Sequence, residues 1–317
     1  MTFLQAIVIG IIQGVAELFP ISSLGHTVII PAFIGGSWSR LVTQQASSES
    51  PYLAFVVGLH VATALALLTY FWRDWVRIIK GFFSSLAKRR AETADERAAW
   101  FVIVATIPVG ILGLSLEHQL RTLFAKPLAA ATFLTINGLI LLGGEWLRRK
   151  GRANPKVRPS AAAERPVGGG GALASEPGAP VGTDAHDPEV LGSLRLRDAL
   201  VVGVAQSAAL LAGISRDGIC MVTGLVRGLS YEDAARFAFL LSAPPILLAG
   251  LLKIPDLLGS LGNGIRGQVL AGSAAAFVMA LLSVRFLLRY FQTRGLTPFA
   301  CYCLALGAAG IVYFGIQ

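Results

Sequence analysis

Charged side chains are scarce in this 317-residue chain. Only 14% of the residues are Asp, Glu, Lys or Arg, against about 25% in an average soluble domain, and 54% are hydrophobic. A mean hydropathy of +0.66 over 33.4 kDa means more apolar surface than one water-soluble core can bury, whereas several bilayer spans would use it. The composition excludes an ordinary cytosolic globule and predicts a polytopic membrane protein.

Cysteine and acidic residues are also few. Cys220, Cys301 and Cys303 are odd in number and lie in apolar segments, a pattern that favours neither a disulfide framework nor a zinc site. Basic residues exceed acidic ones by 27 to 18, but they lie mainly between apolar segments, where they set topology, which argues against a nucleic-acid partner. The N-terminus lacks the basic region and cleavage site of a signal peptide, so we expect it to stay on the mature protein.

Six apolar runs are long enough to cross a hydrocarbon core of about 30 Å. They cover Tyr52–Trp72, Trp100–Leu116, Leu128–Leu147, Ala234–Leu252, Val269–Leu288 and Pro298–Phe314. Two further apolar stretches, Phe3–Phe33 and Ala199–Val226, are each broken near the middle by Gly, Ser and charged or titratable residues. The pattern predicts an all-α membrane protein with six transmembrane helices and two re-entrant helical hairpins.

The chain repeats itself at an offset of 193 residues. Residues 6–26 align with residues 199–219, and nine of these 21 positions are identical, including matched Gly, Gln and Ser. The region 148–194 is rich in Gly, Pro, Ala and charge, which is typical of a disordered linker. We therefore expect a first half at 1–147, a linker at 148–194 and a second half at 195–317.

Basic residues predict the topology. They cluster between Arg73 and Arg97 and again at Arg148–Lys150, so both segments should be cytoplasmic. Three full spans separate the two hairpins, which must then enter from opposite sides as an inverted repeat, with both termini periplasmic. Paired broken helices in two repeat halves point to a binding site near the membrane midplane.

The first hairpin carries a cluster of polar residues. Gln13 and Glu17 lie four apart and share one helix face, and Pro20 ends that helix. The serines that follow can cap the next helix, whose N-terminus offers free backbone N–H groups to an anion. The candidate site residues of this hairpin are Gln13, Glu17, Ser22, Ser23 and His26.

The second hairpin supplies Gly213, Ser215 and Arg216 at the equivalent break. Around a pseudo-two-fold axis, Arg216 would approach the first turn, and a guanidinium beside two helix N-termini, a hydroxyl and an imidazole would form a phosphate site. Asp217 could pair with Arg216 and leave most of its guanidinium free. His60 lies in the middle of a span, without a charged neighbour in sequence, and is interpreted as a polar packing residue.

These motifs resemble the undecaprenyl-diphosphate phosphatase family of bacteria, the bacitracin-resistance type. Gln13 and Glu17 match its (E/Q)xxxE motif, and the segment Pro20–His26 matches its P-x-S-S-x-G-H turn. The segment Ala212–Cys220 matches its P-G-x-S-R-S-x-x-T motif only in part, because Ala, Asp and Cys replace the usual Pro, Ser and Thr at Ala212, Asp217 and Cys220. The resemblance extends over nearly the whole chain outside the linker.

The resemblance implies a bacterial cytoplasmic-membrane enzyme that hydrolyses undecaprenyl diphosphate, which recycles the lipid carrier of cell-wall synthesis, with a site reached from the periplasmic side. It implies a divalent cation, Mg²⁺ or Ca²⁺, bound by Glu17. By analogy, Ser23 attacks the terminal phosphorus, His26 assists proton transfer and Arg216 holds the diphosphate. Gln13, Ser22, Gly213 and Ser215 would complete the substrate-binding set.

Several alternatives stay open at the level of sequence. A water activated by His26 competes with Ser23 as nucleophile. A polyprenyl-phosphate carrier or flippase would also use broken helices around a phosphate site, and a non-catalytic homologue would keep the fold alone. The oligomeric state is open, with a homodimer among the options. Asp217 places a negative charge beside Arg216, which could weaken diphosphate affinity or recruit metal.

Overall fold

The computed structural model describes residues 1–44, 51–116, 126–153, 196–259 and 262–316. Within them the protein contains only helices. Six are long and apolar enough to cross a membrane, so the expectation of a multi-pass all-α protein is confirmed. They are α4 (Pro51–Tyr70), α6 (Ala94–Ser115), α8 (Pro127–Ala153), α12 (Tyr231–Leu258), α13 (Arg266–Thr293) and α14 (Thr297–Gly315).

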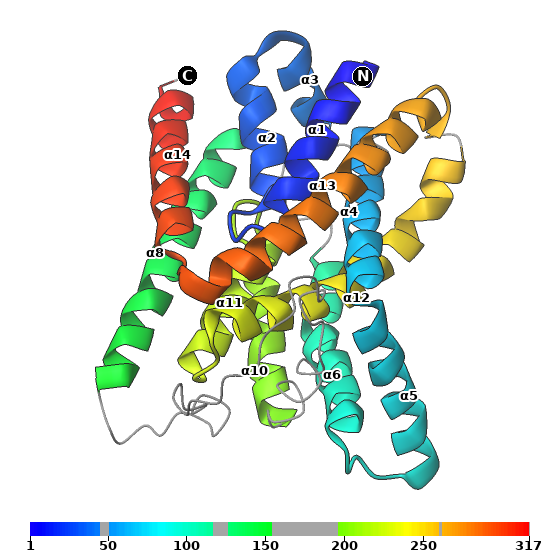
Figure 1. Ribbon diagram of the computed structural model, residues 1–317. Coiled ribbons are helices and arrows are strands. Elements are labelled where there is room, and N and C mark those ends of the chain that lie inside the picture. Colours follow the sequence, from blue (N-terminus) through cyan, green and yellow to red (C-terminus); the bar gives the residue numbers. More distant parts are fainter. Residues whose placement is uncertain (45–50, 117–125, 154–195, 260–261, 317) are drawn as a thin grey trace, which may run out of the picture.

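Four shorter helices form two pairs. The first pair is α1 (Phe3–Ala16) and α2 (Ser23–Ile34), and the second is α10 (Leu196–Gln206) and α11 (Arg216–Val226), with the short 3₁₀ helix η2 (Ser207–Leu210) after α10. Figure 1 shows the first pair in the upper half of the molecule and the second in the lower half, with their turns near the centre. Two broken segments therefore meet in the interior.

The ends of the chain and the basic segments lie at opposite ends of the molecule. Both termini are at the top of Figure 1, whereas the connection between α5 (Trp72–Lys88) and α6, the end of α8 and the start of α10 are at the bottom. This arrangement places the basic segments on one side, as the positive-inside rule requires of cytoplasmic segments.

Helix α12 runs through the core. Five consecutive residues, Phe237 to Leu241, are at most 2% exposed, and a helix buried on all sides must be enclosed by neighbours. It packs against α4, α6, α11 and α13. Helix α12 of the second half therefore contacts helices of both halves of the chain.

The structure differs from the sequence expectations in three places. The region 73–97 was expected only as a basic cytoplasmic segment, but most of it is helix α5 and the start of α6. The predicted linker begins too early, since residues 148–153 extend α8. The remainder of the predicted linker, residues 154–194, lies outside the described residues. Helix α3 (Gly36–Gln44) was also not predicted.

Candidate active site

The turn between α1 and α2 is set by local sequence. Glu17 caps the C-terminus of α1, Pro20 lies in the turn, and Ser22 caps α2 by accepting a hydrogen bond from the backbone N–H of Gly25 at 3.3 Å. Ser22 has a φ of +68°, a conformation that costs a residue with a Cβ atom on the order of 1 kcal/mol. Such backbone strain clusters at functional sites.

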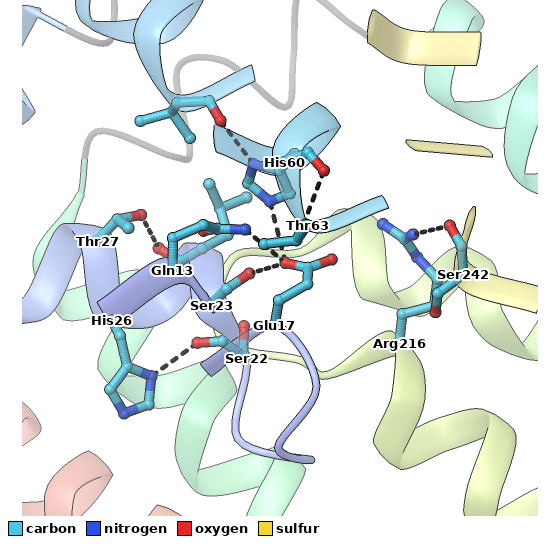
Figure 2. Close-up of polar contacts among 12 residues, drawn as sticks. Gln13, Glu17, Ser22, Ser23, His26, Thr27, His60, Thr63, Arg216 and Ser242 are labelled. Carbon is cyan, nitrogen blue, oxygen red and sulfur yellow. Dashed lines mark hydrogen bonds and ion pairs between the residues drawn. The ribbon is translucent and has the colours of Figure 1, made fainter. Parts of the chain in front are cut away.

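The Glu17 carboxylate is the centre of the polar cluster (Figure 2). Its Oε2 atom accepts hydrogen bonds from Nε2 of Gln13 at 2.8 Å and from Oγ of Ser23. Nε2 of His60 on α4 lies 3.3 Å from the same oxygen, while its Nδ1 donates to the Val56 carbonyl at 2.8 Å. The carboxylate is therefore aligned by three side chains from three different segments, with the Ser23 hydroxyl bonded directly to it.

His26 is turned away from this cluster. Its Nδ1 lies 2.7 Å from the Ser22 carbonyl oxygen, and its Nε2 lies 2.9 Å from the hydroxyl of Tyr302 on α14. Because a carbonyl oxygen only accepts, Nδ1 carries a proton, and Nε2 bonds with the Tyr302 hydroxyl. Figure 2 shows the imidazole pointing away from Glu17. Both ring nitrogens are thus occupied, and the Ser23 hydroxyl bonds to Glu17 and not to His26.

The second turn presents the arginine. Ser215 caps α11 by accepting from the backbone N–H of Gly218 at 3.1 Å. Arg216 donates from Nη1 to the carbonyl of Ser242 on α12 at 3.2 Å, and the Ser242 hydroxyl donates to Oδ1 of Asp217. In the described contacts Ser242 therefore engages both side chains, in place of the direct Arg216–Asp217 pair considered from the sequence.

The two turns touch each other. The backbone N–H of Gly213 donates to Oγ of Ser22 at 3.1 Å. A Cβ atom on Gly25 would lie only 2.9 Å from the Gly213 Cα atom, and one on Gly213, whose φ is +116°, would lie 2.4 Å from the Ala130 carbonyl oxygen of α8. Since this N–H is used by Ser22, Gly213 acts here as a packing and turn residue, and its predicted contact with substrate stays a prediction.

Unpaired buried polar atoms occur near both turns. Six buried side-chain nitrogen or oxygen atoms among the described residues lack a hydrogen-bond partner, and three belong to this cluster: Oε1 of Gln13, Nε of Arg216 and Oδ2 of Asp217. Buried polar groups are normally paired, so exceptions need an explanation. Figure 2 shows Arg216 on the side of Glu17 opposite His26. These three atoms retain hydrogen-bonding capacity for a polar ligand.

Sequence reasoning missed four residues that the structure places here. The interpretation of His60 as a packing residue is wrong, because its imidazole faces Glu17. A titratable residue in the middle of a span was itself a signal of function. Asn137, Ser242 and Tyr302 carried no such signal, because their partners are far away in sequence.

The described residues include no group of three or more His, Cys, Asp or Glu side chains able to hold a metal ion. The oxygen donors near the turn are the Glu17 carboxylate and the unpaired Oε1 atom of Gln13. Mg²⁺ commonly binds through one or two protein oxygens together with substrate phosphates and water. The donor set therefore fits a hard cation shared with a phosphorylated ligand, and a dedicated protein cage is not formed.

Comparison with known proteins identifies the family. Residues 6–309 match the family model described as bacitracin resistance protein BacA. The chain belongs to the BacA family. Both turns of the candidate site fall within the matched region.

Curated BacA-type relatives are similar over their full length. The chain is 56% identical over 339 residues to "Undecaprenyl-diphosphatase 2" of Frankia alni, an alignment that covers 100% of this chain and 99% of that protein. It is 54% and 53% identical, over 321 residues each, to proteins named "Undecaprenyl-diphosphatase" from Mycolicibacterium paratuberculosis and Mycobacterium avium, again with 100% of this chain and 99% of each relative covered.

Proposed function

We propose that this protein is an undecaprenyl-diphosphatase, which hydrolyses undecaprenyl diphosphate to undecaprenyl phosphate and inorganic phosphate. The observation that carries the proposal is the Ser23 hydroxyl hydrogen-bonded to the Glu17 carboxylate, with Arg216 of the second turn on the side of Glu17 opposite His26. A nucleophile in contact with a base is the signature of covalent catalysis. The full-length relatives named for this activity support the same reaction.

Ser23 acts as the nucleophile in the proposed mechanism. Its Oγ attacks the terminal phosphorus as its proton passes to Glu17, and the bond from that phosphorus to the bridging oxygen breaks. Undecaprenyl phosphate leaves with the bond's electron pair and takes up the proton from Glu17. A water then attacks the phosphorus of the phosphoserine as its proton passes to Glu17. The bond from phosphorus to Oγ breaks, Glu17 returns that proton to Oγ, and phosphate is released. The competing nucleophile is a water aligned by Glu17, with Ser23 as a hydrogen-bonding group.

Arg216 binds and orients the diphosphate. Its Nη1 atom is fixed by the Ser242 carbonyl, whereas its buried Nε atom has no partner and is free to donate to a phosphate oxygen. A guanidinium matches phosphate geometry and stays charged at all physiological pH values. Phosphoryl transfer depends mainly on positioning and charge neutralisation, so Arg216 should matter more than its single hydrogen bond suggests.

A divalent cation, Mg²⁺ or Ca²⁺, completes the proposed site. Glu17 and Oε1 of Gln13 would hold it together with the phosphates of the substrate. When bound, it supplies neutralisation of the diphosphate charge. The hydroxyls of Ser22 and Ser215 and the N-termini of α2 and α11 then contact the remaining phosphate oxygens.

We further propose that the two short helix pairs are re-entrant hairpins of an inverted repeat, with halves at 1–147 and 195–317 joined by the region 148–194. Two observations support this arrangement: both termini lie at the same end of the molecule, and the basic segments lie at the other end. The protein would lie in the bacterial cytoplasmic membrane, with the α1–α2 turn opening toward the periplasmic side.

The test is phosphate release from undecaprenyl diphosphate by purified protein, with Mg²⁺ or Ca²⁺ and with chelator. Wild type should release phosphate only with cation, and Ser23→Ala and Arg216→Ala should lose most of the activity while staying folded. Trapped phosphate on Ser23 would identify the covalent route, and its absence in a burst experiment would select the water. No release by folded wild type, across cations and prenyl lengths, would refute the enzyme and favour a carrier.

A further inference from the structure

Asn137 lies in the middle of α8 and bonds to both turns of the candidate site. Its side chain is 0% exposed. Nδ2 donates to the carbonyl oxygen of Pro20 in the first turn at 2.9 Å, and Oδ1 accepts from the backbone N–H of Ser215 in the second turn at 2.9 Å. Nδ2 also lies 3.4 Å from Sγ of Cys303. One amide thus joins three segments that are more than 70 residues apart in sequence.

Packing alone does not account for an amide at this position. A polar side chain inside a membrane span is costly unless its donors and acceptors are paired, and helix interfaces in membranes can be formed from small apolar residues instead. Asn supplies a donor and an acceptor on one short, planar group. An apolar residue supplies neither and a carboxylate supplies only the acceptor. The two turns require one of each, from a single point on α8.

The turns that Asn137 joins carry the reacting groups. Pro20 precedes Ser23 by three residues, and Ser215 directly precedes Arg216. Besides Asn137, the described contacts between the turns include the bond from Gly213 to Ser22 and the close approach of Gly25 to Gly213. Movement of either turn by an ångström would change the distance from the Ser23 hydroxyl to the phosphate that Arg216 holds.

We infer that Asn137 is a positioning residue: it sets the separation between the nucleophile turn and the arginine turn. The inference rests on the proposed function for its kinetic consequence. Misplacement of about 1 Å between reacting groups costs on the order of 10²-fold in rate. Because Arg216 itself is retained, binding of the diphosphate changes much less than turnover does.

The decisive variant is Asn137→Leu, which keeps the size and removes both bonds. We expect kcat to fall about 10- to 100-fold and KM to change less than about threefold. Thr135→Val is the matched control, because Thr135 lies on the same helix and, among the described contacts, its hydroxyl bonds to the Ala131 carbonyl of α8 and to neither turn. This control should keep kcat and KM within about twofold. Asn137→Ser, which can bond to only one turn at a time, serves if the leucine variant does not fold.

A second readout is independent of activity. Hydrogen exchange of a peptide containing Ser215, followed by mass spectrometry on the full-length protein in detergent, should be faster in Asn137→Leu than in wild type and unchanged in Thr135→Val. Faster exchange with unchanged kcat would show that Asn137 has only a structural role and would overturn the positioning role. Unchanged exchange would also overturn it. If wild type releases no phosphate, the proposed function fails, and the exchange data alone then decide whether Asn137 ties the turns.

Discussion

Replacing Glu17 with Gln tests the proposed base most directly. The amide keeps the shape of the side chain, but its single oxygen carries no charge and cannot take a proton from Ser23. In wild type, Oε2 of Glu17 accepts hydrogen bonds from Gln13 and Ser23 and lies 3.3 Å from Nε2 of His60. A charge-assisted hydrogen bond contributes ~1.5–3 kcal/mol and a neutral one ~0.5–1.5 kcal/mol, so the alignment of Ser23 weakens as well as its activation.

The expected loss follows from these two effects. General-base catalysis contributes about 10²- to 10⁴-fold, and we expect kcat of Glu17→Gln to fall about 10³-fold, or ~4 kcal/mol in activation free energy. Removal of a negative charge near the diphosphate should leave KM at saturating Mg²⁺ equal to or below that of wild type. The apparent Mg²⁺ requirement should rise, because one proposed oxygen donor becomes a weaker ligand.

The assay is steady-state phosphate release at several Mg²⁺ concentrations, normalised to folded protein. Glu145→Gln is the matched control, since Glu145 is also buried and accepts hydrogen bonds from Tyr231 and the backbone of Leu296, both at 2.6 Å. Its loss should lower thermal stability and leave kcat within about threefold. A kcat of Glu17→Gln within tenfold of wild type would refute Glu17 as the base.

Further predictions concern the residues around Glu17. Arg216→Lys should raise KM and lower kcat, together about 10²-fold in kcat/KM, because an ammonium cannot keep the Ser242 contact and form a forked pair with phosphate; unchanged kcat/KM would exclude the proposed diphosphate contact. Asp217→Ser should lower KM about tenfold, because two like charges about 10 Å apart repel by ~1.7 kcal/mol at an effective dielectric near 20; no fall of KM in titrations with substrate would count against charge repulsion. His60→Leu should lower kcat about tenfold, which corresponds to the ~1 kcal/mol of one hydrogen bond. His60→Gln can still donate to Glu17 and should recover most of this loss in kcat. Equal losses in both variants would rule out alignment through hydrogen bonding. Gly213→Ala should abolish folded protein in size-exclusion chromatography, because the new Cβ would meet the α8 backbone at 2.4 Å, and a folded, active variant would contradict the close packing of the turns.

The six spans could be predicted because hydrophobicity alone decides them. Each is a run of apolar residues, and the bounds of the helices found agree with the expected ranges to within about six residues at either end. Helix α5 could not be recognised as an apolar run, because Arg and Lys interrupt it. It is an amphipathic helix that packs against α6, with Ile78 and Ser85 buried, so the 3.6-residue period of its apolar positions was the available signal.

The candidate site was predictable where its residues are close in sequence. Gln13 and Glu17 share a helix face at a spacing of four, and both serines follow within six residues. His26 shows the limit of this reasoning. It lies one turn from the serines, as expected, but Tyr302, 276 residues away, engages its ring. His60 and Asn137 meet their partners only through tertiary packing, which one sequence does not reveal.

The division of the site between two distant turns has a consequence for biogenesis. A chain emerging from the ribosome inserts Glu17 and Ser23 almost at once, but Arg216 and its supporting helix α12 arrive only after two thirds of the protein has been made. Throughout that interval the first turn lacks the residue proposed to hold the diphosphate. Under the proposed mechanism, reactivity toward the lipid carrier is acquired only when the second half docks, and incomplete nascent chains should be inert.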